Sequence, residues 1–402
     1  MNRLSLFLVL WFCILFPCSA SAALLSATEL GGHLKTLNLY LDRLPDGSAE
    51  GLFSSTSLRL DLTGRVADDY AFELSVEQQL LWSDPPGLAG LQGDSTNQAE
   101  AGEHSWNRDG RFESQLRLDR LNLRGQRYGI DWSIGRQAIG FGRISLFSPL
   151  DVIAPFPPDA LDVDVRPGVD AIKITRFFGL GGQLGGVLVF GDQPRHNSYL
   201  FTFSENLNNL DLLLLTGSLR DRPMLGAGLA GEVGLLGLKG EVSWYRGTQV
   251  GTLQGDRRGD FAIAALEGWY RFSGGLVLIG EYLYNGVGSN DPAQYPLVAT
   301  SAPSAEGLSF LLGRHYLLLG PAYELHPLVT ASGLVLHNLQ DHSSLIRPQM
   351  AISLSDNFQL DLFWAFTVGD KQGLDPITGL PQVRSEFGGS GDSGGLLLRW
   401  YF

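Results

Sequence analysis

Cysteine is nearly absent from this sequence of 402 residues. The two cysteines, Cys13 and Cys18, both lie within the first 22 residues. The rest of the chain therefore cannot form a disulfide and has no thiolate for catalysis or for a metal site. This composition suits an oxidising compartment, because no free thiol is available for oxidation there.

Long apolar runs are also missing beyond residue 22, where no 18 consecutive residues are apolar. A membrane-spanning helix needs about 20 such residues, so helical spans are excluded. Yet the chain is 44% hydrophobic, contains 51 glycines and is only 18% charged. Apolar character without long runs is typical of a transmembrane barrel, in which lipid-facing and lumen-facing residues alternate along each strand.

The first residues have the layout of a secretory signal. Arg3 supplies a positive charge, residues 4–16 are mostly apolar, and Ala20, Ser21 and Ala22 form a small-residue cleavage site. We therefore expect residues 1–22 to be a signal peptide and residues 23–402 to be one barrel domain. Loss of Arg3 would take the formal charge from −13 to −14 (−13 − 1). Such an acidic balance argues against nucleic acid as a partner.

Alternation of apolar and polar residues recurs along the whole chain. In one example, Leu58, Leu60 and Leu62 alternate with polar neighbours, as they would on a strand with one apolar face. Candidate strands cover residues 33–44, 56–64, 70–82, 113–125, 128–137, 169–178, 183–190, 198–204, 209–219, 223–232, 235–246, 260–272, 276–285, 309–319, 321–339, 349–355, 358–368 and 393–402. Pro321 would interrupt a hydrogen-bond ladder, so 16 strands stay open beside 18.

The connections between these candidates alternate between short and long, and aromatic residues gather at the strand ends. Both features are typical of outer-membrane barrels, which have short periplasmic turns, longer outer loops and two aromatic belts. The sequence therefore predicts an all-β fold, a transmembrane antiparallel up-and-down β-barrel of about 18 strands. We expect it in the bacterial outer membrane, with both termini on the periplasmic side.

The third long connection, residues 138–168, contains five prolines: Pro149, Pro155, Pro157, Pro158 and Pro167. Proline stiffens a loop by fixing φ, as a permanent constriction would require. We expect this loop to fold into the barrel, although an outward lid or a subunit contact is the alternative. Its predicted constriction residues are Asp151, Asp159, Asp162, Asp164 and Arg166. If the loop folds inward, we expect Asp159, Asp162 and Asp164 to face basic wall residues such as Arg59 and Arg117.

The alternation also predicts which charged residues face the lumen. The predicted pore wall comprises Arg59, Asp61, Glu73, Glu77, Arg117, Asp119, Asp131, Glu241, Glu267, Arg271 and Glu281. Lys173, Lys239, Asp211, Asp361 and Arg399 share this parity. Acidic residues outnumber basic ones, which favours mild cation selectivity. Arg120 conflicts with the alternation around it, so we expect a β-bulge nearby.

No pattern of residues indicates catalysis, a cofactor or a metal. The seven histidines are scattered without metal-ligand spacing. Glu73 and Glu77 lie two lumen positions apart on one strand, where solvated pore lining is the better interpretation. Asp341, His342 and Ser343 are adjacent on an extended chain, so their side chains alternate in direction and cannot form a triad by themselves.

Two stretches resemble porin-like families related to the alginate-export barrels. The first runs from Gly135 through Pro149-Leu150-Asp151 to Asp170, and the second runs from Asn338 to Ser344 and on through Pro348 to Asn357. The resemblance implies an outer-membrane channel. Alginate exporters are expected to line their pore with arginine, whereas acid exceeds base here, which argues against export of a polyanion.

The final strand ends in Trp400 and Phe402 on one face. It resembles the signal that the barrel-assembly machinery reads, so we expect that machinery and outer-membrane lipid as partners. The leading hypothesis is passive diffusion of small polar solutes or ions. A dedicated export or uptake conduit, a sheath around a periplasmic or electron-transfer partner, and a barrel enzyme are the rivals. A homo-oligomer is also left open.

Overall fold

The computed structural model describes residues 25–43, 50–66, 69–86, 97–98, 102–107, 110–179, 181–252, 255–374 and 381–402. The predicted signal peptide, residues 1–22, lies outside the described residues. Among the described residues, no helix is long and apolar enough to cross a membrane.

In this part of the chain, eighteen strands form a closed antiparallel wall. They are β1 (Leu25–Leu41), β2 (Gly51–Val66), β3 (Tyr70–Asp84), β5 (Phe112–Arg127), β6 (Ile130–Gln137), β7 (Val169–Phe178), β8 (Gly182–Phe190), β9 (Ser198–Leu207), β10 (Leu210–Leu219), β11 (Arg222–Val233), β12 (Leu236–Arg246), β13 (Asp260–Arg271), β14 (Val277–Asn285), β15 (His315–His326), β16 (Val329–Asn338), β17 (Ser344–Ser355), β18 (Phe358–Val368) and β21 (Ser393–Tyr401). The predicted all-β barrel of about 18 strands is confirmed.

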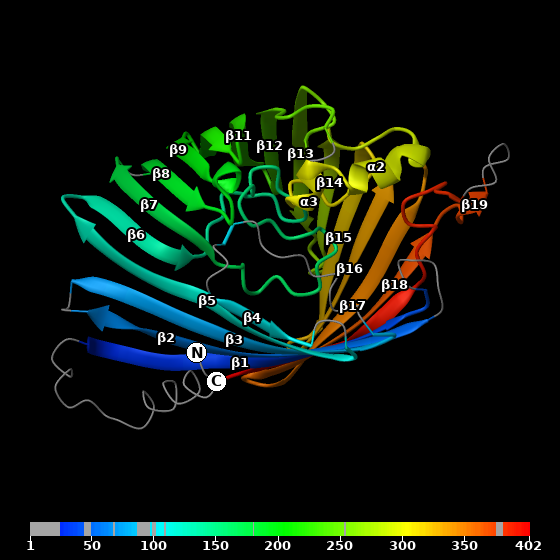
Figure 1. Cartoon of the computed structure of the whole chain (residues 1–402), viewed down its shortest axis with the longest axis horizontal. Coiled ribbons are helices and arrows are strands. Elements are labelled where there is room, and N and C mark those ends of the chain that lie inside the picture. The colour runs from blue at the N-terminus through cyan, green and yellow to red at the C-terminus, as the bar shows by residue number, and fades with distance from the viewer. Residues whose placement is uncertain are drawn as a thin grey trace.

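Pairing of the first and last strands closes the barrel. β1 hydrogen-bonds to β2 on one side and to β21 on the other, with His33 opposite Tyr401 at one end of the seam and Leu41 opposite Ser393 at the other. Figure 1 shows the resulting ring of strands around an interior that contains the connection between β6 and β7. Closure pairs the backbone groups that an open sheet would leave at its edges, as a wall surrounded by lipid requires.

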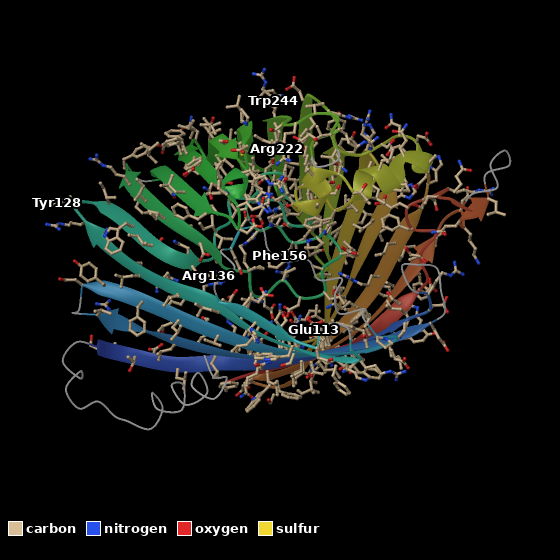
Figure 2. The ribbon with its side chains drawn as sticks, in the orientation of Figure 1. Glu113, Tyr128, Arg136, Phe156, Arg222 and Trp244 are labelled. Carbon is tan, nitrogen blue, oxygen red and sulfur yellow. The ribbon has the colours of Figure 1, made fainter. Side chains whose placement is uncertain are left out.

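The outer face of the wall is apolar, as the alternation predicts. Leu60, Leu214, Leu266 and Leu362 are exposed there. Exposed aromatic residues lie near both ends of the strands, among them Tyr70, Phe178 and Phe272 at the end with short turns and Trp244, Tyr282 and Phe366 at the other. Figure 2 shows Tyr128 and Trp244 on the periphery of the ring.

The structure also contains small elements that are not part of the eighteen-strand wall, and the sequence analysis did not predict them. They are the strand β4 (Glu103–Trp106), the pair β19 (Gly373–Leu374) and β20 (Pro381–Gln382), the 3-10 turns η2 (Pro194–His196) and η3 (Pro292–Gln294), and the short helices α2 (Tyr295–Ala299) and α3 (Ala302–Ala305). β4 pairs with β5, and β19 pairs with β20.

The interruption of a ladder expected at Pro321 is confirmed on one side, but the strands predicted around it, 309–319 and 321–339, had the wrong limits. Pro321 lies inside β15 and pairs with Leu278 of β14. On the other side, the pairing of β15 with β16 skips from Leu319 to Ala322. A proline, which lacks an N–H, is therefore accommodated by a local gap in one ladder rather than by the end of the strand.

A β-bulge lies beside Arg120, as predicted. Ser75 pairs with Arg120 while Val76 pairs with Leu118, so Asp119 is the extra residue in β5. Asp119 and Arg120 are both buried, at 1% and 5% exposure. The bulge places two successive charged side chains in the protein interior, which an unbroken strand would not do.

Candidate pore and the loop inside the barrel

The connection between β6 and β7, residues 138–168, makes contact with the inner wall at several separate strands. Near its start, the backbone N–H of Arg143 donates to Glu241 of β12 at 2.6 Å, and Ser145 N–H donates to Glu267 of β13 at 2.5 Å. Figure 2 shows Phe156, a residue of this loop, in the interior of the ring. The loop therefore lies inside the barrel rather than above its mouth.

The returning part of the loop contacts the opposite side. Arg347 of β17 donates to the carbonyl oxygens of Asp159 and Ala160. Asp162 and Asp164 lie 2.8 Å and 3.0 Å from the ammonium group of Lys35 on β1. The loop therefore crosses the interior from one side of the barrel to the other.

Apolar side chains fill the half of the interior that β7 to β16 surround. Val152 and Ile153 of the loop are 2% and 1% exposed and belong to one cluster of buried residues. The wall contributes Val187, Leu215 and Leu318 to the same cluster. Val298 of α2 and Leu308 of the β14–β15 connection also belong to it. This half is thus packed like the core of a soluble protein.

Two buried arginines cover this packed half at the end of the barrel with long loops. Arg222 pairs with Asp256 at 2.8 Å and with Glu306 at 2.6 Å. Arg220 donates to the carbonyl oxygens of Val152 and Ile153. The β10–β11 turn, two outer loops and the inward loop are therefore joined by charge-assisted hydrogen bonds.

The other half of the interior is polar. A cavity of about 380 Å³ lies between the loop and the wall of β1, β2, β3 and β5. Its charged lining comprises Lys35, Arg59, Glu77, Arg117, Asp119, Asp159 and Asp162. Arg59 lies 2.5 Å from Asp119, and Arg117 lies 2.6 Å from Glu77. Ion pairs along the wall thus replace the apolar packing of the other half.

The loop carboxylates lie near this cavity but pair differently from the expectation. We predicted that Asp159, Asp162 and Asp164 would face Arg59 and Arg117. Asp159 and Asp162 do line the cavity with both arginines, but Asp162 and Asp164 form their ion pairs with wall residues of the closing seam. Asp164 contacts Arg399 at 3.2 Å and accepts a hydrogen bond from the Tyr401 hydroxyl at 2.6 Å.

The other two predicted constriction residues pair with each other. Arg166 lies 2.5 Å from Asp151, and its guanidinium group also stands over the ring of Phe156, 5.1 Å from the ring centre. Arg120 donates to the carbonyl oxygen of Arg166. These contacts hold the return of the loop beside the β-bulge.

The predicted pore-wall residues fall into two groups. The first group lies at inward-facing strand positions away from the loop tip and comprises Arg59, Asp61, Glu73, Glu77, Arg117, Asp119, Asp131 and Arg271. Glu241, Glu267 and Glu281 also point inward, but they are only 4%, 0% and 2% exposed. We expected these three to be solvated, whereas the loop covers them, because irregular backbone inside a barrel must find hydrogen-bond acceptors.

Sequence reasoning missed several inward bases. Lys35, Arg120 and Arg347 are buried in the interior, at 6%, 5% and 8% exposure. Both parities near Lys35 carry leucines, the bulge displaces Arg120, and Arg347 precedes the predicted start of its strand. The predicted excess of lumen acid was therefore too large.

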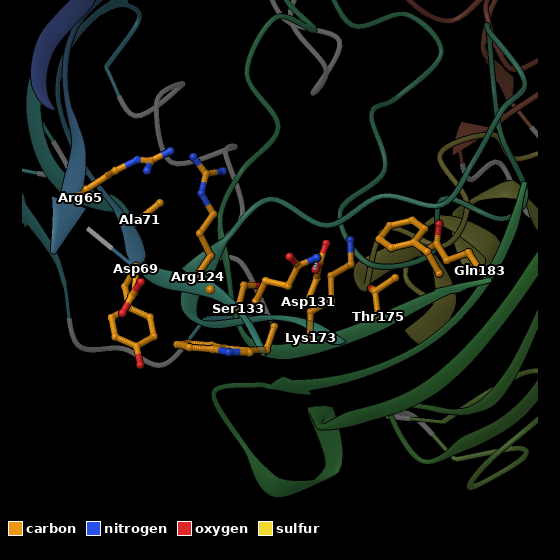
Figure 3. Close-up of a pocket in the computed structure, with 14 residues that line it drawn as sticks. Arg65, Asp69, Ala71, Arg124, Asp131, Ser133, Lys173, Thr175 and Gln183 are labelled. Atoms are coloured by element: carbon orange, nitrogen blue, oxygen red, sulfur yellow. Dashed lines mark hydrogen bonds between the residues drawn. The ribbon is translucent and has the colours of Figure 1, made fainter. Parts of the chain in front are cut away.

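A second cavity, of about 530 Å³, opens at the end of the barrel with short turns. Figure 3 shows the cationic side chains of Arg65, Arg124 and Lys173 together with Asp69 and Asp131 in its lining. Tyr70, Trp132 and Phe177 supply the aromatic part. Arg271, also at this end, is exposed.

The predicted assembly-signal residues lie at the closing seam. Trp400 and Phe402 are 41% and 47% exposed, with ring centres 5.1 Å apart. Phe402 N–H donates to the carbonyl oxygen of Gly32, and Gly32 N–H donates to that of Phe402. Their role in assembly stays a prediction.

Solved porins have a similar fold. The crystal structure of a BenF-like porin from Pseudomonas fluorescens Pf-5 matches 94% of this chain and 99% of its own, with a TM-score of 0.57 and 10% identity. The crystal structure of Acinetobacter baumannii OccAB4 matches 94% of this chain and 98% of its own, with a TM-score of 0.58 and 10% identity. The crystal structure of Acinetobacter baumannii OccAB3 matches 93% of this chain and 99% of its own, with a TM-score of 0.56 and 11% identity.

Sequence comparison adds no relative, since no protein family and no curated protein matches the chain. The likeness to porins therefore concerns the fold. The resemblance to the alginate-export barrels stays a prediction.

Proposed function

We propose that this protein is an outer-membrane channel through which small polar solutes or ions diffuse passively. The carrying observation is the polar half of the barrel interior, where a charged cavity of about 380 Å³ lies between the inward loop and the wall. A closed wall with an apolar exterior suits lipid. A charged interior suits water and polar solutes. The similar fold of solved porins supports this function.

The inward loop is the proposed constriction. It occupies one half of the interior with apolar packing and borders the cavity with Asp159 and Asp162. Permeation would then depend on positioned charges and on pore width, and it requires no covalent chemistry. Within the described residues, no three metal-ligating side chains form a group that could hold a metal ion. The charged cavity beside the loop leads us to favour transport over catalysis.

Weak cation preference is the finer part of the proposal. The cavity beside the loop has four carboxylates, Glu77, Asp119, Asp159 and Asp162, against three bases. The cavity at the other end has three bases against Asp69 and Asp131. Because the charges of the two cavities nearly cancel, we expect low selectivity overall, with its sign set at the smaller cavity beside the loop.

Reconstitution in a planar bilayer tests the proposal. We expect stable ohmic current steps from purified, folded protein without any partner. A folded barrel that stays closed would contradict passive diffusion. That result would favour a gated export conduit or a sheath whose partner protein is missing.

A further inference from the structure

Three buried glutamates lie side by side on neighbouring strands of the packed half. Glu267 of β13 is directly opposite Glu281 of β14, and Glu241 of β12 is opposite Ala265. Carboxylates placed opposite each other repel, and burial of a charge is costly unless partners compensate it. The only cationic side chain within ion-pair distance of the three, among the described residues, is Lys239, 2.7 Å from Glu267.

The loop tip supplies most of the compensation. Glu241 accepts hydrogen bonds from the backbone N–H groups of Arg143, Ile144 and Leu150 and from the hydroxyl of Ser148. Residues 143–150 therefore wrap around a single carboxylate. A carboxylate that accepts several N–H groups is stabilised in its charged form.

The neighbouring glutamates continue this arrangement. Glu267 accepts from both the N–H and the hydroxyl of Ser145, and Glu281 accepts from the N–H of Phe147 at 3.2 Å. The loop tip contains no regular secondary structure, so its N–H groups would otherwise lack acceptors inside the barrel. The wall carboxylates and the loop N–H groups thus supply each other's hydrogen-bond partners, except at Oε1 of Glu281, which has none.

We infer that Glu241, Glu267 and Glu281 are positioning residues that fix the loop tip against β12 to β14 and confine permeation to the opposite half. The inference rests on the proposed channel function for its second part only. The three carboxylates act through the loop and do not line the path of the solute. They differ in this from Glu77 and Asp119, which border the cavity.

Glu241→Gln is the decisive variant. Glutamine keeps the size of the side chain, but it removes the charge and turns an NH₂ group toward backbone donors. A thiol at Leu146→Cys reports on the loop, because Leu146 packs against the cluster of buried residues and no cysteine remains after residue 22. Asp131→Asn is the matched control for labelling, since it removes one inward carboxylate that accepts a hydrogen bond from Gln126 and lies at the end of the barrel with short turns.

We expect E241Q to increase the labelling rate of L146C about tenfold, because charge-assisted hydrogen bonds to the loop are lost. Single-channel current should become larger and noisier. E281Q should act in the same direction with a smaller effect, because Glu281 accepts fewer donors than Glu241. D131N should leave the labelling rate of L146C unchanged. If E241Q does not assemble, E281Q and E267Q provide the same test.

An L146C labelling rate that is equal in E241Q, E281Q and D131N would overturn the inference. A parent protein that folds but does not conduct would instead refute the proposed channel function. In that case the labelling experiment still decides whether the glutamates hold the loop.

Discussion

The two halves of the barrel interior obey the same strand alternation and yet have opposite chemistry. Inward positions of β8 to β10 include Val187, Leu200 and Leu215, which must be shielded from water, and the loop covers them with Val152 and Ile153. Inward positions of β1 to β5 include Lys35, Arg59 and Glu77 and border a cavity. The comparison shows that filling one side of the interior leaves a charged cavity on the other, and the proposed solute path would be confined to that side.

The largest expected effect comes from a cavity made in the packed half. Leu150→Ala should destabilise the folded state by about 2–5 kcal/mol, because Leu150 is fully buried and its neighbours can relax only partly. Leu37→Ala, at the cavity of the polar half, should cost much less, since Leu37 is only half-buried. Denaturant unfolding of the detergent-folded barrel measures both. Equal losses would contradict the division into two halves.

The closing seam, which borders the polar half, should be sensitive to loss of the terminal residue. Deletion of Phe402 removes two backbone hydrogen bonds with Gly32 and the ring that packs on Trp400. We expect the amount of assembled barrel in the membrane to fall several-fold, whereas the current through each assembled pore stays the same. Unchanged assembly would contradict the predicted role of this residue.

Prediction from the sequence succeeded where one face of a strand is apolar and the other polar. The strands around Leu58–Leu62 and Leu360–Trp364 are of this kind, and their inward faces were assigned correctly. The strands of the packed half have a different sequence pattern, from which no prediction was made. Residues 210–215 of β10 are apolar on both faces except at Asp211, which is typical of a strand buried on both sides.

The role of the three glutamates could not be predicted from the alternation. The position of Glu241 in the alternation shows only that its side chain points inward. It does not show whether water or a loop occupies the interior there. The partners are separated from it by more than 90 residues along the chain, as with Ser148. Nor does the loop sequence show which wall carboxylates its N–H groups will meet, because backbone donors are the same in every residue.

The smallest expected effect concerns a loop that covers the packed half. Glu386 accepts hydrogen bonds from the hydroxyl of Tyr316, from Asn338 and from the N–H of Leu312. Withdrawal from water raises the pKa of Glu386 to about 7, and these hydrogen bonds oppose the rise only in part. Its pKa in a released loop would be about 4.3.

The folded loop therefore holds a proton that the released loop loses between these two pKa values. Docking of residues 381–392 should be strongest at the acid end of this range and should weaken as the pH rises toward 7. Hydrogen exchange of this segment, corrected for intrinsic rates, should be slower at pH 5 than at pH 8. Glu386→Gln should abolish the difference, and a difference that persists in this variant would assign the effect to another group.

The reversal potential under a salt gradient tests most directly whether solutes pass the loop on the polar side. Asparagine at Asp159, Asp162 and Asp164 preserves size and unmasks Lys35 and Arg399, so selectivity should shift toward anions. The shift should be larger at 0.1 M salt, where the screening length is about 10 Å, than at 1 M, where it is about 3 Å. Asparagine at Asp192, Asp221 and Asp291 removes the same charge from the outer loops and should have little effect. A folded triple variant of the inward loop with an unchanged reversal potential would show that these carboxylates lie outside the permeation path.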